Sequence, residues 1–415
     1  MFSLLATSVV IASDLPKFDT PPDEVVYRGV TEEQWETISR IGDPLNCRQR
    51  VYDLQSLDLD EFYELKPEDC NNVSCIKDAL KENKNVILRE GTYISRGIEL
   101  NNNALVGFPN EKIIINAIED YGIYMTDSIV SNVIIQNAKN NGISIIRNNL
   151  IYRVVVGNTG VHYKDSQRGI GFEQDGIKNS KNNCIVSAEA YNGYNYKSSY
   201  SAGIKGGAAD GFSAKRIIYD NLTFIDAHGH HNSDHGFDFY CSGNYASKPV
   251  VRLYYSSAVK SRNPYKFGGD ASGIKIGGEK NEPECDRKVE KQTPRIFYST
   301  VACWNPKRDI TNSNNVKLIK LNDKDDPLRL KCGDFRDVKK IKKRWFDLDP
   351  QYEIFGDEII NKGQFFDPET DKSNTNLNDR ELTEEIDNMF SNQLPEWSGR
   401  LLLSVSEQYL TVYLK

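Results

Sequence analysis

The sequence predicts an all-β fold, a parallel β-helix in which short strands stack as successive coils of a solenoid. The 415 residues include 22 Tyr but only three Met, and 39% are hydrophobic, a composition that favours a β-rich core over a helical one. Between Ile113 and Val316 one unit recurs: a short β-branched strand, an Asn-rich turn, and a Gly followed by an apolar residue. A chain this long exceeds the usual size of one globular core, a limit that an elongated repeat architecture escapes.

Each copy of the repeat has two strands. The first strand is predicted at Asn132–Ile135, Asn149–Tyr152, Asn183–Val186, Asn221–Phe224 and Arg295–Tyr298. The second strand is predicted at Gly122–Tyr124, Gly142–Ser144, Gly211–Ser213, Gly236–Asp238 and Gly273–Lys275. The connecting segments are too short for the helical crossovers of doubly wound α/β folds, and they lack the tight turns of an antiparallel sandwich. We interpret the Asn residues in the turns as structural, because Asn tolerates left-handed conformations and can form ladders between coils.

A short helical cap is predicted before the solenoid. Thr31 and Gln34 match a capping box, which predicts a helix with Trp35 and Ile38 on its buried face. A second short helix, from Ser74 to Lys81, is expected to cover the open end of the first coil, since the apolar end of a solenoid needs a cap.

The chain is therefore divided into four segments. Residues 1–12 are a candidate signal peptide, 13–84 the N-terminal cap region, 85–322 the β-helix with its groove, and 323–415 an irregular C-terminal extension that packs on the helix. The extension is charge-rich, and a helix is predicted in it from Glu381 to Phe390.

Charge and composition exclude some classes of partner. A net charge of -7 and a pI near 5.5 argue against nucleic-acid binding, which needs a basic excess. No apolar stretch reaches the roughly 18 residues that span a bilayer, so we expect no membrane association. We expect a secreted, extracellular monomer, although the apolar run from Phe2 to Ala12 lacks a preceding Lys or Arg and also fits a disordered N-terminus. The eight cysteines fit either disulfides or buried thiols.

Two acidic clusters lie one coil apart in the predicted solenoid. Asp234 follows Asp210 by 24 residues, which places the two carboxylates on neighbouring coils about 4.8 Å apart. Asp238 alternates with Phe237 and Phe239, so it faces outwards if the rings face the core. Three converging carboxylates repel one another without a cation, and oxygen ligands suit Ca²⁺. The alternative is that each Asp only makes a turn.

Lys275 is the candidate base. It alternates with Ile274 and Ile276, so it faces outwards from the sheet if these two side chains face inwards. The coil after Asp234 is expected to return at this position, and a neighbouring dication would disfavour the ammonium form of Lys275. A neutral lysine could then accept a proton. The alternative is an ordinary solvated lysine.

Three segments, in this order and spacing, resemble the linked signatures of family 9 pectate lyases: Gly206 to Lys215, Asn232 to Asp238, and Gly273 to Gly278. The resemblance covers roughly residues 85–320. It implies a right-handed β-helix, a calcium ion held by aspartates, and a lysine base. By position, the calcium ligands correspond to Asp210, Asp234 and Asp238, and the base corresponds to Lys275.

The sequence departs from the family pattern at His235, where a second consecutive Asp is usual. A neutral nitrogen is a poor calcium ligand, so we expect weaker calcium binding or a different metal. Because His228, His230, His231 and His235 lie within eight residues, a zinc or manganese site is an alternative. In a strand, however, His231 would point away from His228 and His230. We therefore interpret His235 as a weak metal ligand or a sugar contact in the groove.

The predicted activity is calcium-assisted β-elimination on an acidic polysaccharide, polygalacturonate or pectin. A cation on the uronate carboxylate stabilises the enolate-like intermediate that forms when Lys275 removes the C5 proton. Five further cations are predicted to bind substrate carboxylates: Lys205, Lys215, Lys260, Arg262 and Lys266. One alternative is a hydrolase that uses Asp234 and Asp238 as its acid and base. The other is a non-catalytic glycan-binding β-helix or adhesin.

Overall fold

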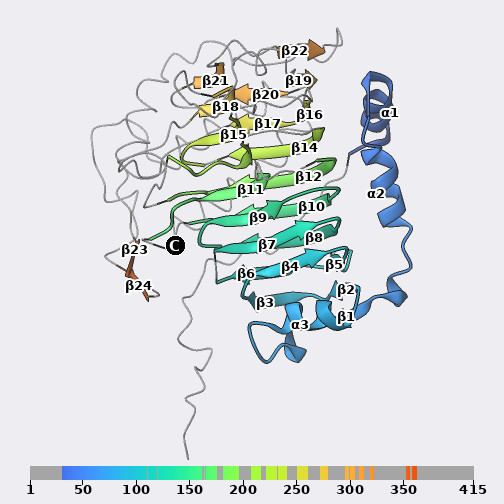
Figure 1. Cartoon of the computed structure of the whole chain (residues 1–415), viewed down its shortest axis with the longest axis vertical. Helices are drawn as coiled ribbons and strands as arrows, with labels where there is room; N and C mark the ends of the chain where they lie inside the picture. Colours follow the sequence, from blue (N-terminus) through green and yellow to red (C-terminus); the bar gives the residue numbers. More distant parts are fainter. Residues whose placement is uncertain are drawn as a thin grey trace, which may run out of the picture.

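The computed structural model of the chain is a right-handed parallel β-helix, as the sequence predicts (Figure 1). The structure describes residues 30–109, 111–118, 120–160, 163, 165–174, 181–195, 207–215, 221–230, 232–240, 250–259, 272–278, 295–298, 300–303, 308–312, 318–321, 352–355 and 358–361. The predicted signal peptide and the predicted helix from Glu381 to Phe390 lie outside these ranges. No helix within them is long and apolar enough to cross a membrane.

Two sheets, whose strand pairs are all parallel, form the walls of the solenoid. The larger, sheet A, contains β1 (Tyr63–Leu65), β2 (Asn85–Leu88), β3 (Gly91–Ser95), β5 (Ala104–Gly107), β6 (Ile113–Ala117), β8 (Ile129–Gln136), β10 (Leu150–Gly157), β12 (Asn183–Tyr191), β14 (Leu222–His230), β16 (Val251–Tyr254), β17 (Ser257–Val259), β19 (Arg295–Tyr298), β20 (Val301–Cys303) and β22 (Leu318–Leu321). The smaller, sheet B, contains β4 (Ile98–Asn101), β7 (Tyr121–Thr126), β9 (Asn141–Ile145), β11 (Ile170–Gln174), β13 (Phe212–Ala214), β15 (His235–Phe239), β18 (Ser272–Ile276) and β21 (Arg308–Asn312). A separate antiparallel pair is formed by β23 (Tyr352–Phe355) and β24 (Glu358–Asn361).

The two predicted strands of the repeat correspond to these two walls. The predicted first strands lie in sheet A and the predicted second strands in sheet B. The chain therefore runs through each of the two sheets once in every coil. Two alignments in the prediction were wrong. Asn221 is not equivalent to Asn183, because Asn183 pairs with Leu222. Asn132 is not equivalent to Asn149, because Val133 pairs with Val154 and Asn132 therefore lies opposite Arg153 in the middle of the strand.

Apolar side chains that point inwards from both sheets form the core between them. On sheet B the rings of Phe172, Phe212 and Phe237 stack on successive coils, with centroids 4.8 and 4.7 Å apart. Sheet A supplies mainly Val, Ile, Leu and Ala to the same core. Because inward and outward residues alternate, this core fixes which side chains face outwards on each coil.

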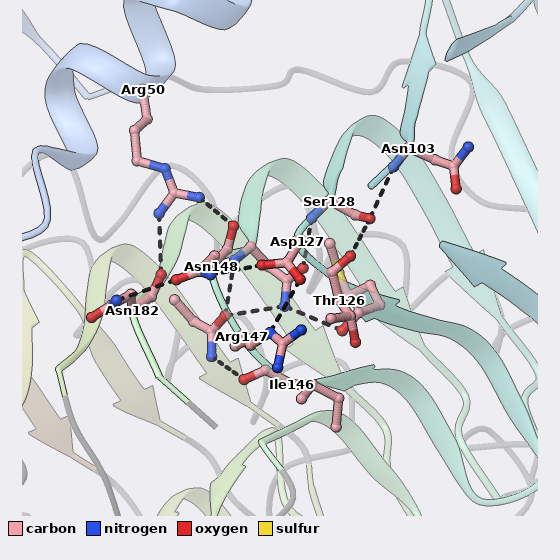
Figure 2. Close-up of polar contacts among 12 residues, drawn as sticks. Arg50, Asn103, Thr126, Asp127, Ser128, Ile146, Arg147, Asn148 and Asn182 are labelled. Atoms are coloured by element: carbon pink, nitrogen blue, oxygen red, sulfur yellow. Dashed lines mark hydrogen bonds and ion pairs between the residues drawn. The ribbon is translucent and has the colours of Figure 1, made fainter. Parts of the chain in front are cut away.

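The turns between sheets B and A are built from stacked left-handed residues. Asn102, Asp127, Asn148 and Asn182 all have φ between 49° and 59°, and their side chains join adjacent coils. Asn148 Nδ2 donates to Asp127 Oδ1 at 2.6 Å, and Asn182 Nδ2 donates to Asn148 Oδ1 at 3.2 Å (Figure 2). The predicted structural role of Asn in the turns is confirmed, since this conformation costs Asn and Asp less than other non-Gly residues.

The predicted N-terminal helices are present. The capping box of Thr31 and Gln34 begins α1 (Glu32–Ile41), with Trp35 and Ile38 buried. At the end of the solenoid, α3 (Cys75–Glu82) packs against the first strands of the two sheets, as expected of a cap. Two short 3₁₀ helices, Leu59–Glu61 and Pro67–Asp69, lie between these helices.

The sequence analysis missed α2 (Cys47–Gln55), which runs beside sheet A with α1 (Figure 1). Its Val51 and Leu54 join a second apolar cluster on the outer side of sheet A. Arg50 donates to the backbone oxygens of Asn148 at 2.8 Å and Asn182 at 3.2 Å (Figure 2). The helix pair therefore covers one flank of the solenoid, whereas the prediction placed only an end cap in this region.

Two disulfides, Cys47–Cys184 and Cys70–Cys75, pair four of the eight cysteines. The first bond joins α2 to β12, and the second lies at the start of α3. The question left open by the sequence is settled in favour of disulfides for these four. Cys241, Cys285 and Cys332 lie outside the described residues.

Removing the long-range disulfide should destabilise the protein more than removing the short one. Cys47–Cys184 closes a separation of 137 residues and Cys70–Cys75 one of five. Loop-closure entropy then predicts losses of about 5 and about 2 kcal/mol in the free energy of unfolding. Denaturant unfolding of the two Cys→Ser double variants measures both. Equal losses would show that closure of the long loop is not the main contribution.

Candidate active site

The predicted site residues lie on neighbouring coils of sheet B. Asp210 lies two residues before β13, Asp234 directly precedes β15, Asp238 lies in β15, and Lys275 lies in β18. The Cα of Asp238 is paired with that of Lys275 on the next coil. The register is the one implied by the predicted equivalence of Gly211–Ser213 and Gly236–Asp238: because Phe212 pairs with Phe237, Asp210 lies opposite His235, with Asp234 one residue before it on the neighbouring coil.

Alternation along the two strands separates the site from the core. Phe237 and Phe239 flank Asp238 and are buried in the core, as are Ile274 and Ile276 on either side of Lys275. Asp238 and Lys275 therefore point away from the core. Asp238 is nevertheless only 2% exposed. Lys275 is partly buried, and its ammonium lies 4.7 Å from the centre of the Tyr240 ring, within cation–π range.

His235 joins two of the aspartates. Its Nδ1 lies 3.0 Å from Asp210 Oδ1 and 3.4 Å from Asp234 Oδ1. These three residues are buried, and each offers a metal-ligand atom within 4.8 Å of the others. Among the described residues this is the one group of three with such spacing.

Lys215 occupies the other side of Asp210. Its Nζ lies 3.0 Å from Asp210 Oδ2 and 3.7 Å from Asp238 Oδ2. Lys215 was predicted to bind substrate carboxylates, yet its contacts in the structure are with the carboxylates of the cluster. The other oxygen of Asp238, Oδ1, is buried and accepts no hydrogen bond from any described residue.

The charges of the cluster shift its protonation equilibria. Burial alone would lower the pKa of His235, but the charge of Asp234 and the hydrogen bonds to Asp210 and Asp234 outweigh it and raise the pKa to about 10. Burial also opposes the charged form of Lys275, but Asp238 and Asp234 hold its pKa above the ordinary value. Burial likewise opposes the charged form of Lys215, but the charges of Asp210, Asp238 and Glu173 outweigh it and raise the pKa of Lys215. The protein's own groups therefore keep all three bases protonated at neutral pH.

Calcium suits the carboxylates of this cluster, but two basic side chains, His235 and Lys215, already contact them. Asp210 and Asp234 supply carboxylate oxygens, the ligand type that calcium prefers. Asp238 is not part of the group of three that these two form with His235, but its Oδ1 is a buried acceptor suited to a cation. His235 Nδ1 contacts both Asp210 and Asp234, and the raised pKa of His235 keeps the ring protonated, so it must lose a proton before it can offer a nitrogen lone pair to a metal. In addition, a cation must compete with Lys215 for Asp210 and Asp238.

The two other histidines that the structure describes, His228 and His230, do not extend the metal cluster. His228 contacts Asp226 through Nε2 at 2.9 Å and Ser257 through Nδ1 at 2.7 Å, so both of its ring nitrogens are engaged. His230 contacts Glu189 at 2.8 Å. Both histidines lie on β14 in sheet A, on the same face as predicted. His231 lies outside the described residues, as do the predicted substrate-binding cations Lys205, Lys260, Arg262 and Lys266.

Sequence reasoning missed Glu173, which lies on the same outward column as Asp238. Glu173 pairs with Ser213, and Ser213 pairs with Asp238. A signal for it was present: Gly171-Phe172-Glu173 repeats the pattern of Gly236-Phe237-Asp238, with Gly, an inward aromatic ring and an outward polar residue. The repeat was overlooked because the long turns on either side spread the copies far apart in the sequence.

The raised pKa of His235 predicts that stability depends on pH. Because the folded state holds this proton more tightly than the unfolded state, the contribution is complete below the ordinary pKa of 6.5. It is lost as the pH rises towards about 10. Urea unfolding with a chelator present should therefore show falling stability across this window. His235→Gln should flatten the decline, and an equally steep decline in that variant would contradict the assignment.

A comparison with protein-family models agrees with this architecture. A family model described as "Pel9A-like, right handed beta helix region" matches residues 72–324. A solved structure titled "Crystal structure of pectate lyase Pel9A" is 20% identical, with a TM-score of 0.44. The match covers 58% of this chain and 63% of that one, so the chain spans less than two thirds of that protein. No curated protein matches the sequence.

Proposed function

Because the chain belongs to the Pel9A-like family of right-handed β-helix proteins, we propose that it is a calcium-dependent pectate lyase with Lys275 as its base. The observation that carries the proposal is the pairing of Lys275 with Asp238 on adjacent strands. It brings a lysine beside a cluster of buried carboxylates on the outer side of sheet B. A base next to a cation site is the arrangement that proton abstraction beside a carboxylate needs.

In the proposed reaction, the aspartates hold the cation and orient the substrate. Asp210, Asp234 and Asp238 are the proposed ligands. Bound there, the cation withdraws charge from the substrate carboxylate and disfavours the ammonium form of Lys275. Neutral Lys275 takes the proton from C5, a double bond forms between C4 and C5, and the glycosidic oxygen leaves C4 with the bonding electrons. This oxygen then accepts a proton, which the Lys275 ammonium can return. The elimination requires no water.

The protein's own charges make the cation essential in this proposal. Without it, Asp238 and Asp234 favour the protonated form of Lys275, which cannot accept a proton. We also propose that Lys215 is released from Asp210 and Asp238 when the cation binds and then faces the substrate. The same contacts favour a second candidate function, a non-catalytic glycan-binding β-helix, because His235 and Lys215 already neutralise part of the cluster.

We further propose that the protein is secreted and acts on an acidic polysaccharide. The two disulfides support an oxidising compartment. The division into a cap region (13–84), a catalytic β-helix (85–322) and a C-terminal extension (323–415) is likewise proposed, although β1 (Tyr63–Leu65), which pairs with β2, already belongs to sheet A and lies within 13–84.

Product analysis in water labelled with a heavy oxygen isotope tests the proposal. Elimination from polygalacturonate gives an unsaturated uronide that carries no label at the cleaved bond. A hydrolase instead gives a saturated product with labelled oxygen at the new reducing end. A glycan-binding protein gives neither product but retains the polymer. Labelled saturated product would refute the lyase assignment.

A further inference from the structure

A second charged pair lies on sheet B, on the N-terminal side of the aspartate cluster. Arg168 Nη1 donates hydrogen bonds to both carboxylate oxygens of Glu173, at 2.7 and 2.8 Å. Asn141, two coils before Ser213, also donates to Glu173 through Nδ2. Glu173 is thus fixed by two partners from two different segments of the chain.

The pair lies on the same outward column as the candidate active site. Phe172 beside Glu173 is buried in the core, so Glu173 points to the outer side of β11. Two successive pairings, Glu173 with Ser213 and Ser213 with Asp238, set Glu173 two coils from Asp238. With adjacent strands about 4.8 Å apart, the separation along the axis is about 10 Å.

Of the two side chains in this pair, that of Arg168 is the one that a ligand would contact. The Glu173 side chain is 5% exposed, whereas that of Arg168 is 28% exposed. A buried carboxylate that accepts hydrogen bonds from an arginine fixes the position of the guanidinium group and restricts its motion. The surface therefore presents a guanidinium group held in a fixed position. It lies beyond the aspartate cluster along the outward column of sheet B.

We propose that Arg168 forms a subsite that binds a carboxylate of an acidic polysaccharide, on a uronate unit away from the cleaved bond. The proposal rests on the proposed function for the class of ligand. A polyuronide that follows the outward column past Lys275 and Asp238 reaches Arg168 two coils further on. Guanidinium pairs with carboxylates through directed hydrogen bonds, and this gives the subsite a preference for uronate over neutral sugar. Glu173 is then a positioning residue.

Binding of polygalacturonate to variants in a Lys275→Ala background measures the subsite without turnover. Arg168→Met should weaken binding about tenfold, the loss expected for one charge-assisted contact. Arg168→Lys should recover only part of this loss, because ammonium lacks the planar donor geometry. Glu173→Gln should weaken binding to a smaller degree. Neutral galactan, which has no carboxylates, should bind equally to all variants.

Arg89→Met is the matched control. Arg89 also pairs with a glutamate, Glu111, and is 32% exposed, but it follows β2 in sheet A, several coils from the site. Its loss should reduce stability without changing polygalacturonate affinity. Unchanged affinity in Arg168→Met would overturn the proposal, and so would an equal loss of affinity in Arg89→Met.

Turnover separates failure of the subsite from failure of the proposed function. In the background with Lys275 intact, Arg168→Met should raise KM and leave kcat nearly unchanged. If Arg168→Met forms unsaturated product with an unchanged KM, the subsite proposal is wrong and the lyase proposal stands. If the parent protein forms no product but Arg168→Met still binds polygalacturonate tenfold more weakly, the lyase proposal is wrong and the polyuronide-binding subsite stands.

Discussion

Replacing Lys275 with alanine should reduce unsaturated product formation about a thousandfold, the size of effect expected when a general base is removed. The fold should survive, because Ile274 and Ile276 make the core contacts of β18 and Lys275 points away from the core. Circular dichroism and the melting temperature check the fold, and initial rates on polygalacturonate with calcium check the chemistry.

Two further variants show whether proton transfer is the lost step. Lys275→Arg keeps the positive charge but cannot deprotonate near neutral pH, so it should be as inactive as Lys275→Ala. Lys81→Ala removes a lysine that is 67% exposed on α3 and should change nothing. Retention of more than about a tenth of the activity in Lys275→Ala would exclude Lys275 as the base.

Replacing His235 with aspartate should strengthen calcium binding about tenfold and raise activity at limiting calcium. The change supplies a carboxylate ligand and removes a side chain whose pKa of about 10 keeps it cationic at neutral pH. A tenfold gain corresponds to about 1.4 kcal/mol, a modest value for a hard cation that gains an anionic ligand. Calorimetric titration with calcium measures the affinity directly. His235→Asn is the control, because it removes the positive charge of the imidazolium ring without adding a carboxylate.

The opposite result would change the metal assignment. If His235→Asp loses activity, and the parent protein binds manganese or zinc more tightly than calcium, then His235 is a true ligand of a different metal. If no unsaturated product forms with any metal, neither variant matters for catalysis. The glycan-binding interpretation would then replace the lyase.

The sequence was sufficient for the fold because each coil repeats the same local pattern. On sheet B the pattern is a Gly, then an inward apolar residue such as Phe237 or Ile274, then an outward polar residue. Stacking of successive coils reinforces this pattern. The positions of Asp238 and Lys275 on one outward column follow from this alternation. Their Cα pairing agrees with the position that the sequence predicted for the returning coil.

The rest depends on contacts that the pattern does not encode. The register places Asp210 opposite His235, but the contacts of His235 Nδ1 with both Asp210 and Asp234 depend on side-chain conformations that the pattern does not give. The helix α2 has little amphipathic pattern, and its place beside sheet A depends on Arg50 and the Cys47–Cys184 bond. Lys215 reaches back to Asp210 through a flexible side chain, which no spacing rule predicts.

The most direct test of the central claim is the ultraviolet absorbance of unsaturated product during incubation of the unmodified protein with polygalacturonate, with calcium and with a chelator. A calcium-dependent lyase should give a rise in absorbance that the chelator abolishes and that added calcium restores. No rise under either condition, while new reducing ends accumulate, would contradict β-elimination and identify a hydrolase.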